Sequence, residues 1–226
     1  MSETLAGPVG APPPVRFRVP IHGPESFPNP RPRVLVAIPQ NHDFVAEDFR
    51  LATQELKTWP GCALQRFCAP YVDEMRNEAA RWAMEKGYEA TLFIDADMVF
   101  LPDALERISA HGKPIVSGHC LKRRRPFGPT TAIESEGKLH ILTIEGRGLM
   151  PVDAVGAAFL WVSIDVFRSI RPPWFEHGRL GEDYDFCEKA RKAGFSIHVD
   201  LDIRVGHITQ AVVWPGDDGM PVVMMK

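Results

Sequence analysis

A short apolar segment that ends in two aspartates constrains the fold of this chain most strongly. The segment Thr91–Ile94 is followed by Asp95-Ala96-Asp97. An apolar run this short, preceded by Gly87, indicates a buried β-strand rather than a helix. Residues i and i+2 of a strand share a face, so Asp95 and Asp97 are expected to point the same way from its carboxyl end. Open α/β sheets bind ligands at that edge.

The two carboxylates need a partner, because neighbouring negative charges repel each other unless a cation or a hydroxyl group lies between them. Hard divalent cations prefer oxygen ligands, so Asp95 and Asp97 form a candidate metal site. The alternative is a strand that ends in a polar turn, with an aspartate capping the next helix. Short motifs of this kind often arise by chance, so the rest of the chain has to distinguish the two interpretations.

Strands and helices alternate around this segment. The apolar patterns predict strands over 33–38, 62–67, 91–94, 113–118 and 157–162, and helices over 46–59, 71–86, 102–110 and 181–194. A hairpin is expected over 126–151, and a last strand pair near 196–199 and 204–207 precedes a short tail. The early alternation predicts an α/β fold with a mostly parallel central sheet flanked by helices, and the later strands add a smaller mixed or antiparallel portion.

The first 32 residues differ in composition from the rest of the chain. They hold nine of the 21 prolines. Proline lacks a backbone donor and restricts the residue before it, so residues 1–32 are expected to form an extended or disordered arm. Residues 33–226 have a length that suits a single domain.

Charge and cysteine usage narrow the functional class. The net charge of −3 gives no general attraction to nucleic acid or to anionic membranes, and the one concentrated basic run is Lys122–Arg125. Such a run is usually a solvated surface, although one or two of its side chains are candidates for phosphate contacts. The four cysteines have no metal-binding spacing, and no apolar run approaches a membrane span. These features predict a cytoplasmic protein without a membrane span.

Five motifs follow one another along the chain: the early strand VLVAIP, an Arg-Asn pair on the second helix, the D-x-D after a buried strand, a Gly-Glu-Asp helix start, and a C-terminal histidine. Their order resembles that of nucleotide-sugar glycosyltransferases with the GT-A fold, and is closest to the family 2-like group. The resemblance extends from about Arg33 to His207.

The resemblance implies a metal-dependent hexosyltransferase. Such enzymes move a sugar from a nucleoside diphosphate, here expected to be UDP, to an acceptor hydroxyl, and the reaction is expected to invert the anomeric centre. Mn²⁺ or Mg²⁺ neutralises the departing diphosphate. By this resemblance Asp97 and His207 ligate the metal, and Asp95 holds the ribose or a metal-bound water as a further member of the metal site. A lone histidine is otherwise more often an ordinary hydrogen-bonded residue.

The resemblance also implies a donor-binding set. Arg76 and Asn77 match the pair that contacts the donor in this group, since a guanidinium suits phosphate and an amide suits the base or the ribose. Pro39 and Asn41 follow the first strand and are expected at the same edge, and Arg123 of the basic run is expected to reach the diphosphate. The alternative for Arg76 is an exposed salt bridge to Asp73 or a neighbouring glutamate.

The Gly181-Glu182-Asp183 segment supplies the candidate catalytic residues. Trp174-Phe175 precede it, as in several inverting glycosyltransferases, whose matching aspartate is the general base. By the resemblance Asp183 deprotonates the acceptor hydroxyl, and Glu182 binds an acceptor or donor-sugar hydroxyl. The alternative is that these carboxylates only cap a helix, where the unpaired amides and the dipole favour negative charge.

Two rival functions stay open at this point. A nucleotidyltransferase shares the layout and the metal carboxylates, but usually has a Gly-rich, cationic loop after the first strand, where this chain has Pro39-Gln40-Asn41-His42. The other rival is a catalytically inactive domain that binds a sugar or a nucleotide. The acceptor is also open: a glycan, a small molecule, or a hydroxymethylated pyrimidine in DNA, as in bacteriophages that modify their DNA.

Overall fold

The computed structural model describes residues 31–41, 45–124, 126–142, 145–209, 211–216 and 219–225, so nearly all of the predicted arm lies outside the described residues. The strands are β1 (Val34–Pro39), β2 (Cys62–Phe67), β3 (Ala90–Ile94), β4 (Met98–Val99), β5 (Ile115–Cys120), β6 (Thr131–Ser135), β7 (Lys138–Ile141), β8 (Leu149–Val152), β9 (Ala154–Val155), β10 (Phe159–Ser163), β11 (Ile197–Ile208), β12 (Ala211–Pro215) and β13 (Pro221–Met225). The helices are α1 (Glu47–Glu55), α2 (Val72–Glu85), α3 (Ala104–Ala110), α4 (Ile164–Ser169) and α5 (Glu182–Lys192).

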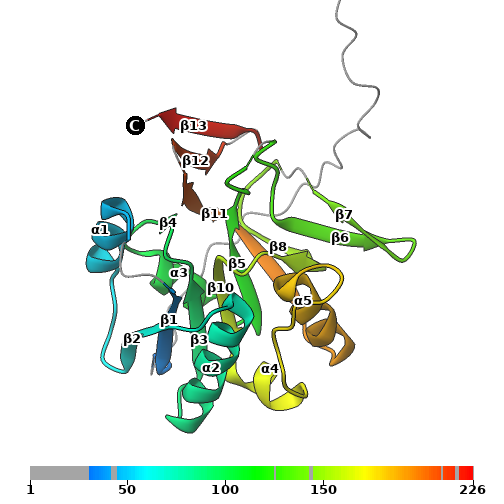
Figure 1. Cartoon of the computed structure of the whole chain (residues 1–226). Coiled ribbons are helices and arrows are strands. Elements are labelled where there is room, and N and C mark those ends of the chain that lie inside the picture. The colour runs from blue at the N-terminus through cyan, green and yellow to red at the C-terminus, as the bar shows by residue number, and fades with distance from the viewer. Residues whose placement is uncertain are drawn as a thin grey trace, which may run out of the picture.

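The central sheet is mostly parallel, as the sequence predicts (Figure 1). β1 pairs in parallel with β2 and β3, and β5 pairs in parallel with β11. β10 lies between β3 and β5 and is antiparallel to both, so β3 and β5 run in the same direction. The order β2-β1-β3-β10-β5-β11 therefore contains one reversed strand, which gives a mixed α/β arrangement of Rossmann-like type.

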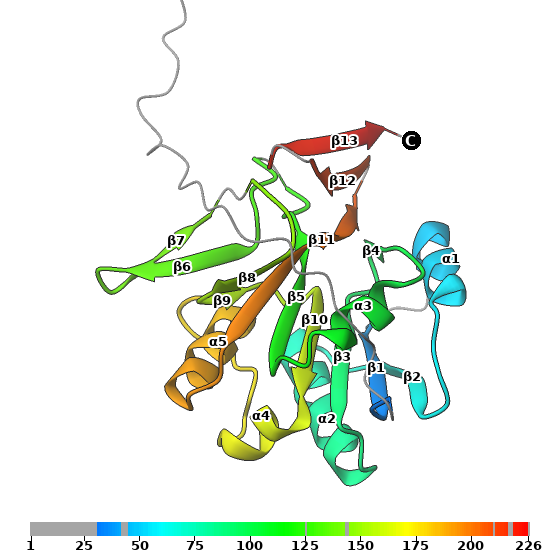
Figure 2. The ribbon, with the colours of Figure 1, turned by 180° about the vertical axis from the view of Figure 1, so that it is seen from behind.

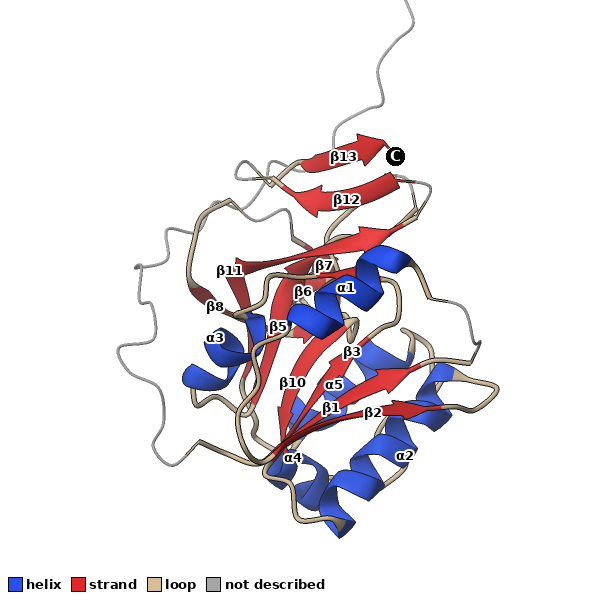
Figure 3. Cartoon of the chain, turned by 90° about the vertical axis from the view of Figure 1, so that its left-hand side faces the viewer, coloured by secondary structure: helices blue, strands red, loops and turns tan. Residues whose placement is uncertain are grey.

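Helices cover both faces of this sheet (Figure 3). Alternate residues of β1 belong to two different cores: Val34 and Val36 pack with residues of α1 and α3, whereas Leu35 and Ala37 pack with residues of α2, α4 and α5. Because both faces of β1 are covered, the strand consists of apolar residues without polar alternation. None of the described helices is long and apolar enough to cross a membrane.

Two helices differ from the predicted limits. α1 ends at Glu55 rather than near Trp59, because the backbone amide of Lys57 donates to the carbonyl of Pro102 instead of continuing the helix. α2 begins at Val72, so Tyr71 precedes the helix and is 67% exposed. The helix predicted over 71–86 is therefore one residue shorter at each end.

The C-terminal region differs most from the prediction. The expected pair of short strands is one long strand, β11, with an irregularity between Asp200 and Arg204. The expected short tail is a β-hairpin, β12–β13, which extends the sheet beyond β11 (Figure 2). The predicted hairpin around Glu136-Gly137 is confirmed as β6–β7 and forms a separate sheet with β9.

The segments that carry the predicted site meet at one edge of the sheet. β1, β3 and β5 end there in Pro39, Ile94 and Cys120, and the antiparallel β10 begins there. Ligands of open α/β sheets bind outside the carboxyl ends of the strands. All four cysteines are free thiols: Cys120 and Cys187 are buried, Cys62 is partly buried and Cys68 is exposed.

Candidate active site

Two adjoining cavities lie at this edge of the sheet. The larger, of about 460 Å³, contains Asp183, Glu182, Arg76 and His207 in its lining, and we call it the base cavity. The smaller, of about 290 Å³, is lined by Pro39, Gln40, Asn41, Val72, Met75 and Asp97, and we call it the loop cavity. Asp95 and Arg123 line both, so they mark where the two cavities meet.

Asp97 and His207 are brought together by strand pairing. β4 follows Asp97 and pairs with β11, with Met98 opposite His207, and the amide of Ile208 donates to the carbonyl of Asp97 at 2.7 Å. Nε2 of His207 lies 3.2 Å from Oδ2 of Asp97, and Nδ1 lies 3.0 Å from the carbonyl oxygen of Leu121. That carbonyl can only accept, so Nδ1 carries a proton and Nε2 is the nitrogen that faces the carboxylate.

Arg123 is the second partner of Asp97. Its Nη1 donates to the same Oδ2 at 2.6 Å, although the arginine side chain is 53% exposed. Burial alone would raise the pKa of Asp97, but the hydrogen bonds and charges of His207 and Arg123 lower it below its usual value. Burial alone would lower the pKa of His207, and the hydrogen bonds with Asp97 and Cys120 raise it to about 10.

This donor set fits a divalent metal in part. A carboxylate oxygen and an imidazole nitrogen point at one another, and the backbone carbonyl that holds Nδ1 is the usual second partner of a metal-bound histidine. Asp95, however, is held elsewhere, and among the described residues no group of three histidine, cysteine or acidic side chains is placed to share one ion. Asp97 and His207 are thus the two residues that would hold a metal, and substrate oxygens or water would complete its shell.

Arg76 links the two halves of the site. Its side chain is 3% exposed, Nη2 donates to Asp95 at 2.8 Å, and Nη1 donates to Glu182 at 2.5 Å. Burial would lower its pKa, and the carboxylates of Asp95, Glu182 and Asp183 raise it, so the guanidinium keeps its charge. The alternative of an exposed salt bridge to Asp73 is therefore wrong.

The same hydrogen bonds bear on the predicted contact between Arg76 and the donor. Both of its terminal nitrogens are engaged by carboxylates, so it positions Asp95 and Glu182. Its Nε is buried and has no partner within the described residues.

Asn77 is likewise occupied by the protein. Its Nδ2 donates to the carbonyl of Phe175 at 2.6 Å, and its Oδ1 accepts from the amides of Trp174 and Phe175. We therefore assign Asn77 to holding the loop that leads to Gly181, and no longer to the donor. The sequence singles out Arg76 and Asn77 together, but it could not show that the amide of Asn77 binds a loop 98 residues away.

Asp183 lies in the first turn of α5 and lines the base cavity. Gly181 precedes the helix with φ of 99°, a conformation that suits glycine, and a Cβ there would lie 3.3 Å from Oδ1 of Asp183. Burial and the charge of Glu182 raise the pKa of Asp183 to about 6, although Arg76 and the amide of Tyr184 oppose the shift. A carboxylate with this pKa is a competent general base near neutral pH.

The predicted first-loop residues and the basic run also reach the site. Pro39 and Asn41 line the loop cavity beside Asp95 and Asp97, and Lys122 and Arg124 line the base cavity. Arg125 lies outside the described residues. Val72 and Met75 of α2, which also line the loop cavity, were not among the predicted site residues. Cys120 was also missed, and its position at the end of β5 was the available signal.

Comparison with known proteins supports the fold alone. The chain is similar to the crystal structure of A197 from STIV, with a TM-score of 0.59 and 17% sequence identity, over 86% of this chain and 95% of A197. No protein family matches the chain, and no curated protein is significantly similar to it. At this identity the likeness shows a shared mixed α/β fold and carries no activity from one protein to the other.

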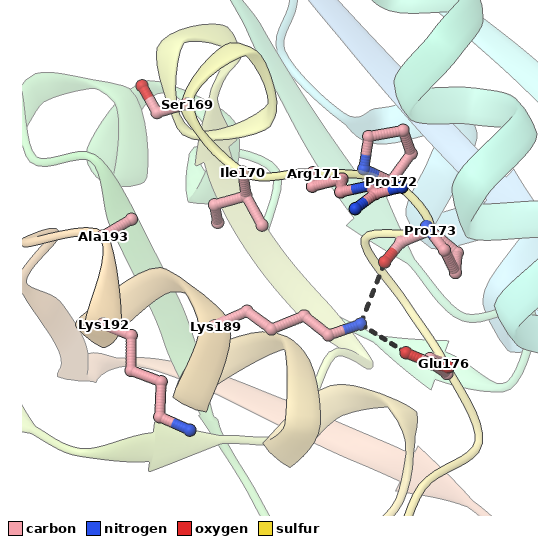
Figure 4. Close-up of a pocket in the computed structure, with 9 residues that line it drawn as sticks. All are labelled: Ser169, Ile170, Arg171, Pro172, Pro173, Glu176, Lys189, Lys192 and Ala193. Carbon is pink, nitrogen blue, oxygen red and sulfur yellow. Dashed lines mark hydrogen bonds and ion pairs between the residues drawn. The ribbon is translucent and has the colours of Figure 1, made fainter.

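A third cavity, of about 470 Å³, lies apart from the site between the loop after α4 and α5 (Figure 4). Nζ of Lys189 crosses it and donates to the carbonyl of Pro173 at 2.9 Å and to Glu176 at 2.7 Å. These contacts fasten the loop to the helix that carries Asp183. Arg171 and Lys192 also line this cavity, and no predicted site residue does.

Proposed function

We propose that this chain is a GT-A glycosyltransferase that moves a sugar from a nucleoside diphosphate, UDP by the resemblance, to an acceptor hydroxyl with inversion. The observation that carries this proposal is the convergence of distant motifs. Segments near residues 40, 76, 95, 123, 182 and 207 line two joined cavities at the carboxyl edge of the sheet. If Asp95 and Asp97 only ended a strand, and Glu182 and Asp183 only capped a helix, these segments would not have to meet.

The loop cavity is the proposed nucleotide site. Val72 and Met75 offer apolar surface to a base, and Asn41 and Gln40 offer polar groups. Asp95, at the junction with the base cavity, is placed for a ribose or a sugar hydroxyl. Arg123 at the same junction is the cation that a diphosphate would meet.

Asp97 and His207 are the residues that would hold Mn²⁺ or Mg²⁺. A bound divalent ion supplies charge neutralisation for a departing diphosphate. Arg123 donates to Oδ2 of Asp97, so the guanidinium and a bound ion would share this carboxylate and compete for that oxygen. Arg123 lines both cavities, so it would also lie near a diphosphate held at the ion.

Asp183 is the proposed base. It takes the proton of the acceptor hydroxyl while that oxygen forms a bond to the anomeric carbon and the bond from this carbon to the diphosphate breaks. Glu182 is fixed through Oε1 by Arg76, and its carboxylate lines the same cavity, where it is placed to accept a hydrogen bond from a sugar hydroxyl. A single displacement of this kind inverts the anomeric centre.

Calorimetric titration with UDP, with and without Mn²⁺, tests the proposal. We expect UDP to bind more tightly with Mn²⁺, and Asp97→Asn to remove this enhancement without unfolding the protein. A UDP affinity that changes neither with Mn²⁺ nor with Asp97→Asn would contradict the metal assignment. No binding of UDP or another nucleoside diphosphate to the wild type would contradict the proposal as a whole. A nucleotidyltransferase would instead consume a nucleoside triphosphate and release pyrophosphate.

A further inference from the structure

Two cations at the rim of the base cavity have no ionic partner among the described residues. Lys122 and Arg124 are exposed, line this cavity, and form no ion pair within the described part of the chain. Their loop is held by its backbone: the amide of Lys122 donates to Gly128 at 2.9 Å, and the amide of Phe127 donates to Arg124 at 2.8 Å. These bonds hold the backbone at Lys122 and Arg124, from which the two exposed side chains extend.

The other charged side chains of the site pair with one another. Arg76 is bound by Asp95 and Glu182, and Arg123 is bound by Asp97. Arg123 is also the cation that the proposed donor diphosphate would meet, at the junction of the two cavities. Lys122 and Arg124 are therefore two positive charges beyond those that the proposed donor chemistry uses.

These two residues lie on the acceptor side. The residues of the proposed nucleotide site line the loop cavity, and neither Lys122 nor Arg124 is among them. Both line the cavity that contains Asp183, the residue that would meet the acceptor hydroxyl. Arg123, between them in sequence, is the member of the run that reaches both cavities.

The ligand that matches this pair is compact. A phosphate monoester carries a charge of about −1.5 to −2 near neutral pH, which two cations match. A nucleic-acid strand would need a row of cations along its backbone. Among the described residues that line the base cavity, every other cation is already paired, so no such row continues from Lys122 and Arg124.

We propose that Lys122 and Arg124 form a phosphate subsite for the acceptor, so that the hydroxyl glycosylated beside Asp183 belongs to a molecule bearing a phosphate monoester. This inference rests on the proposed glycosyltransferase function. The phosphate takes no part in the bond changes. It holds the acceptor so that its hydroxyl proton passes to Asp183 as the sugar is transferred, and the diphosphate leaves with the electron pair of the broken bond.

A matched pair of small probes tests the subsite. Glycerol 3-phosphate and glycerol are titrated by NMR against protein saturated with UDP and Mg²⁺, using wild type, Lys122→Gln/Arg124→Gln, and Arg171→Gln/Lys192→Gln. The last variant removes two exposed cations from the third cavity and serves as the control (Figure 4). We expect wild type and the control to prefer the phosphate probe, and Lys122→Gln/Arg124→Gln to bind it about tenfold or more weakly, the scale of lost charged hydrogen bonds. UDP affinity should stay within about twofold, because the pair lies outside the loop cavity.

Three outcomes would overturn the inference. One is equal binding of the two probes by the wild type. Another is a tenfold loss of UDP affinity in Lys122→Gln/Arg124→Gln, which would place the pair on the donor. The third is that a 20-nucleotide single-stranded oligonucleotide binds far more tightly than glycerol 3-phosphate and with a steep salt dependence. This result would indicate a nucleic-acid acceptor. Failure of the wild type to bind UDP at all would count against the proposed function instead, so the two failures are distinguishable.

Discussion

Asp97 and Asp183 stand at the two ends of one site, and their surroundings shift their acidities in opposite directions. His207 and Arg123 lower the pKa of Asp97, whereas burial and the neighbouring Glu182 raise the pKa of Asp183 to about 6. A carboxylate that stays ionised suits a cation, and one that titrates near neutrality suits proton transfer. The difference shows that the surroundings of a carboxylate can shift its acidity in either direction, and the two proposed roles depend on these opposite shifts.

Asp183→Asn should show the largest effect on activity. The amide keeps the shape of the side chain but cannot take a proton, so we expect turnover to fall by about 10²–10⁴-fold, the usual scale for a general base. Donor affinity should change little, since the loss falls on the chemical step. Asp185→Asn removes the same charge from the same helical turn outside the base cavity, and it should keep most activity. Comparable losses in both variants would reduce Asp183 to a helix cap.

Arg76→Met should show the largest effect on stability. The change leaves the carboxylates of Asp95 and Glu182 facing each other without their buried cation, and breaking a buried pair in this way costs about 3–5 kcal/mol. Chemical denaturation measures this loss of unfolding free energy. Arg81→Met lies on the exposed face of α2 and is the control, expected within about 0.5 kcal/mol of wild type. A small loss for Arg76→Met would show that the two ends of the site are not coupled through this residue.

The pH dependence of turnover and of stability tests the role of Asp183. The pKa of Asp183 lies at about 6, so turnover should fall by about tenfold per pH unit below that value as the base becomes protonated. Its native pKa is raised above the unfolded value near 3.8, so its contribution to stability is complete below pH 3.8 and is lost as pH rises through 6. Asp183→Asn should therefore lose the acidic limb of the turnover profile and become more stable than wild type at pH 8. An unchanged limb in this variant would assign the titration to another group.

Arg123→Ala should show the smallest effects, which are opposite in direction for the affinities of Mn²⁺ and UDP. Without the guanidinium, the shared oxygen of Asp97 is freed, so Mn²⁺ should bind a few-fold more tightly. The diphosphate loses a charged partner, so UDP should bind about tenfold more weakly in the presence of saturating Mn²⁺. Arg124→Ala, one residue away but confined to the base cavity, should change neither affinity. Equal effects of the two substitutions would mean that the run acts only through its overall charge.

The sequence predicts the frame of this molecule well, for identifiable reasons. The run Val34–Pro39 is apolar throughout and Cys62–Phe67 is largely apolar; both are short and bounded by breakers, and both form strands as predicted. Because the first half of the chain alternates strands and helices, the ends of its parallel strands gather at one edge. The positions of Asp95 and Asp97 at this edge follow from that rule without knowledge of any contact. The position of Asp183 does not, because its helix follows the antiparallel β10, which ends at the opposite edge.

What the sequence could not show is how the side chains divide their partners. Arg76 and Asn77 are adjacent on α2, but one is bound by two carboxylates and the other by a loop backbone. The contacts with Glu182 and Phe175 span 106 and 98 residues, so local spacing carries no information about them, and the contact with Asp95 spans 19. The β12–β13 hairpin, by contrast, was missed although the runs AVVW and PVVMM stand on either side of Gly-Asp-Asp-Gly, a pattern typical of a hairpin.

Proton NMR of the first sugar released or transferred tests the central claim most directly. Wild type is incubated with Mn²⁺ and a set of α-linked UDP-sugars, with water or glycerol 3-phosphate as the acceptor, and the anomeric signal is read before free sugars interconvert. Attack from the Asp183 side with the diphosphate leaving on the other side predicts a β product from an α donor, and no such product from Asp183→Asn. An α product, or a donor that is never consumed, would contradict the account.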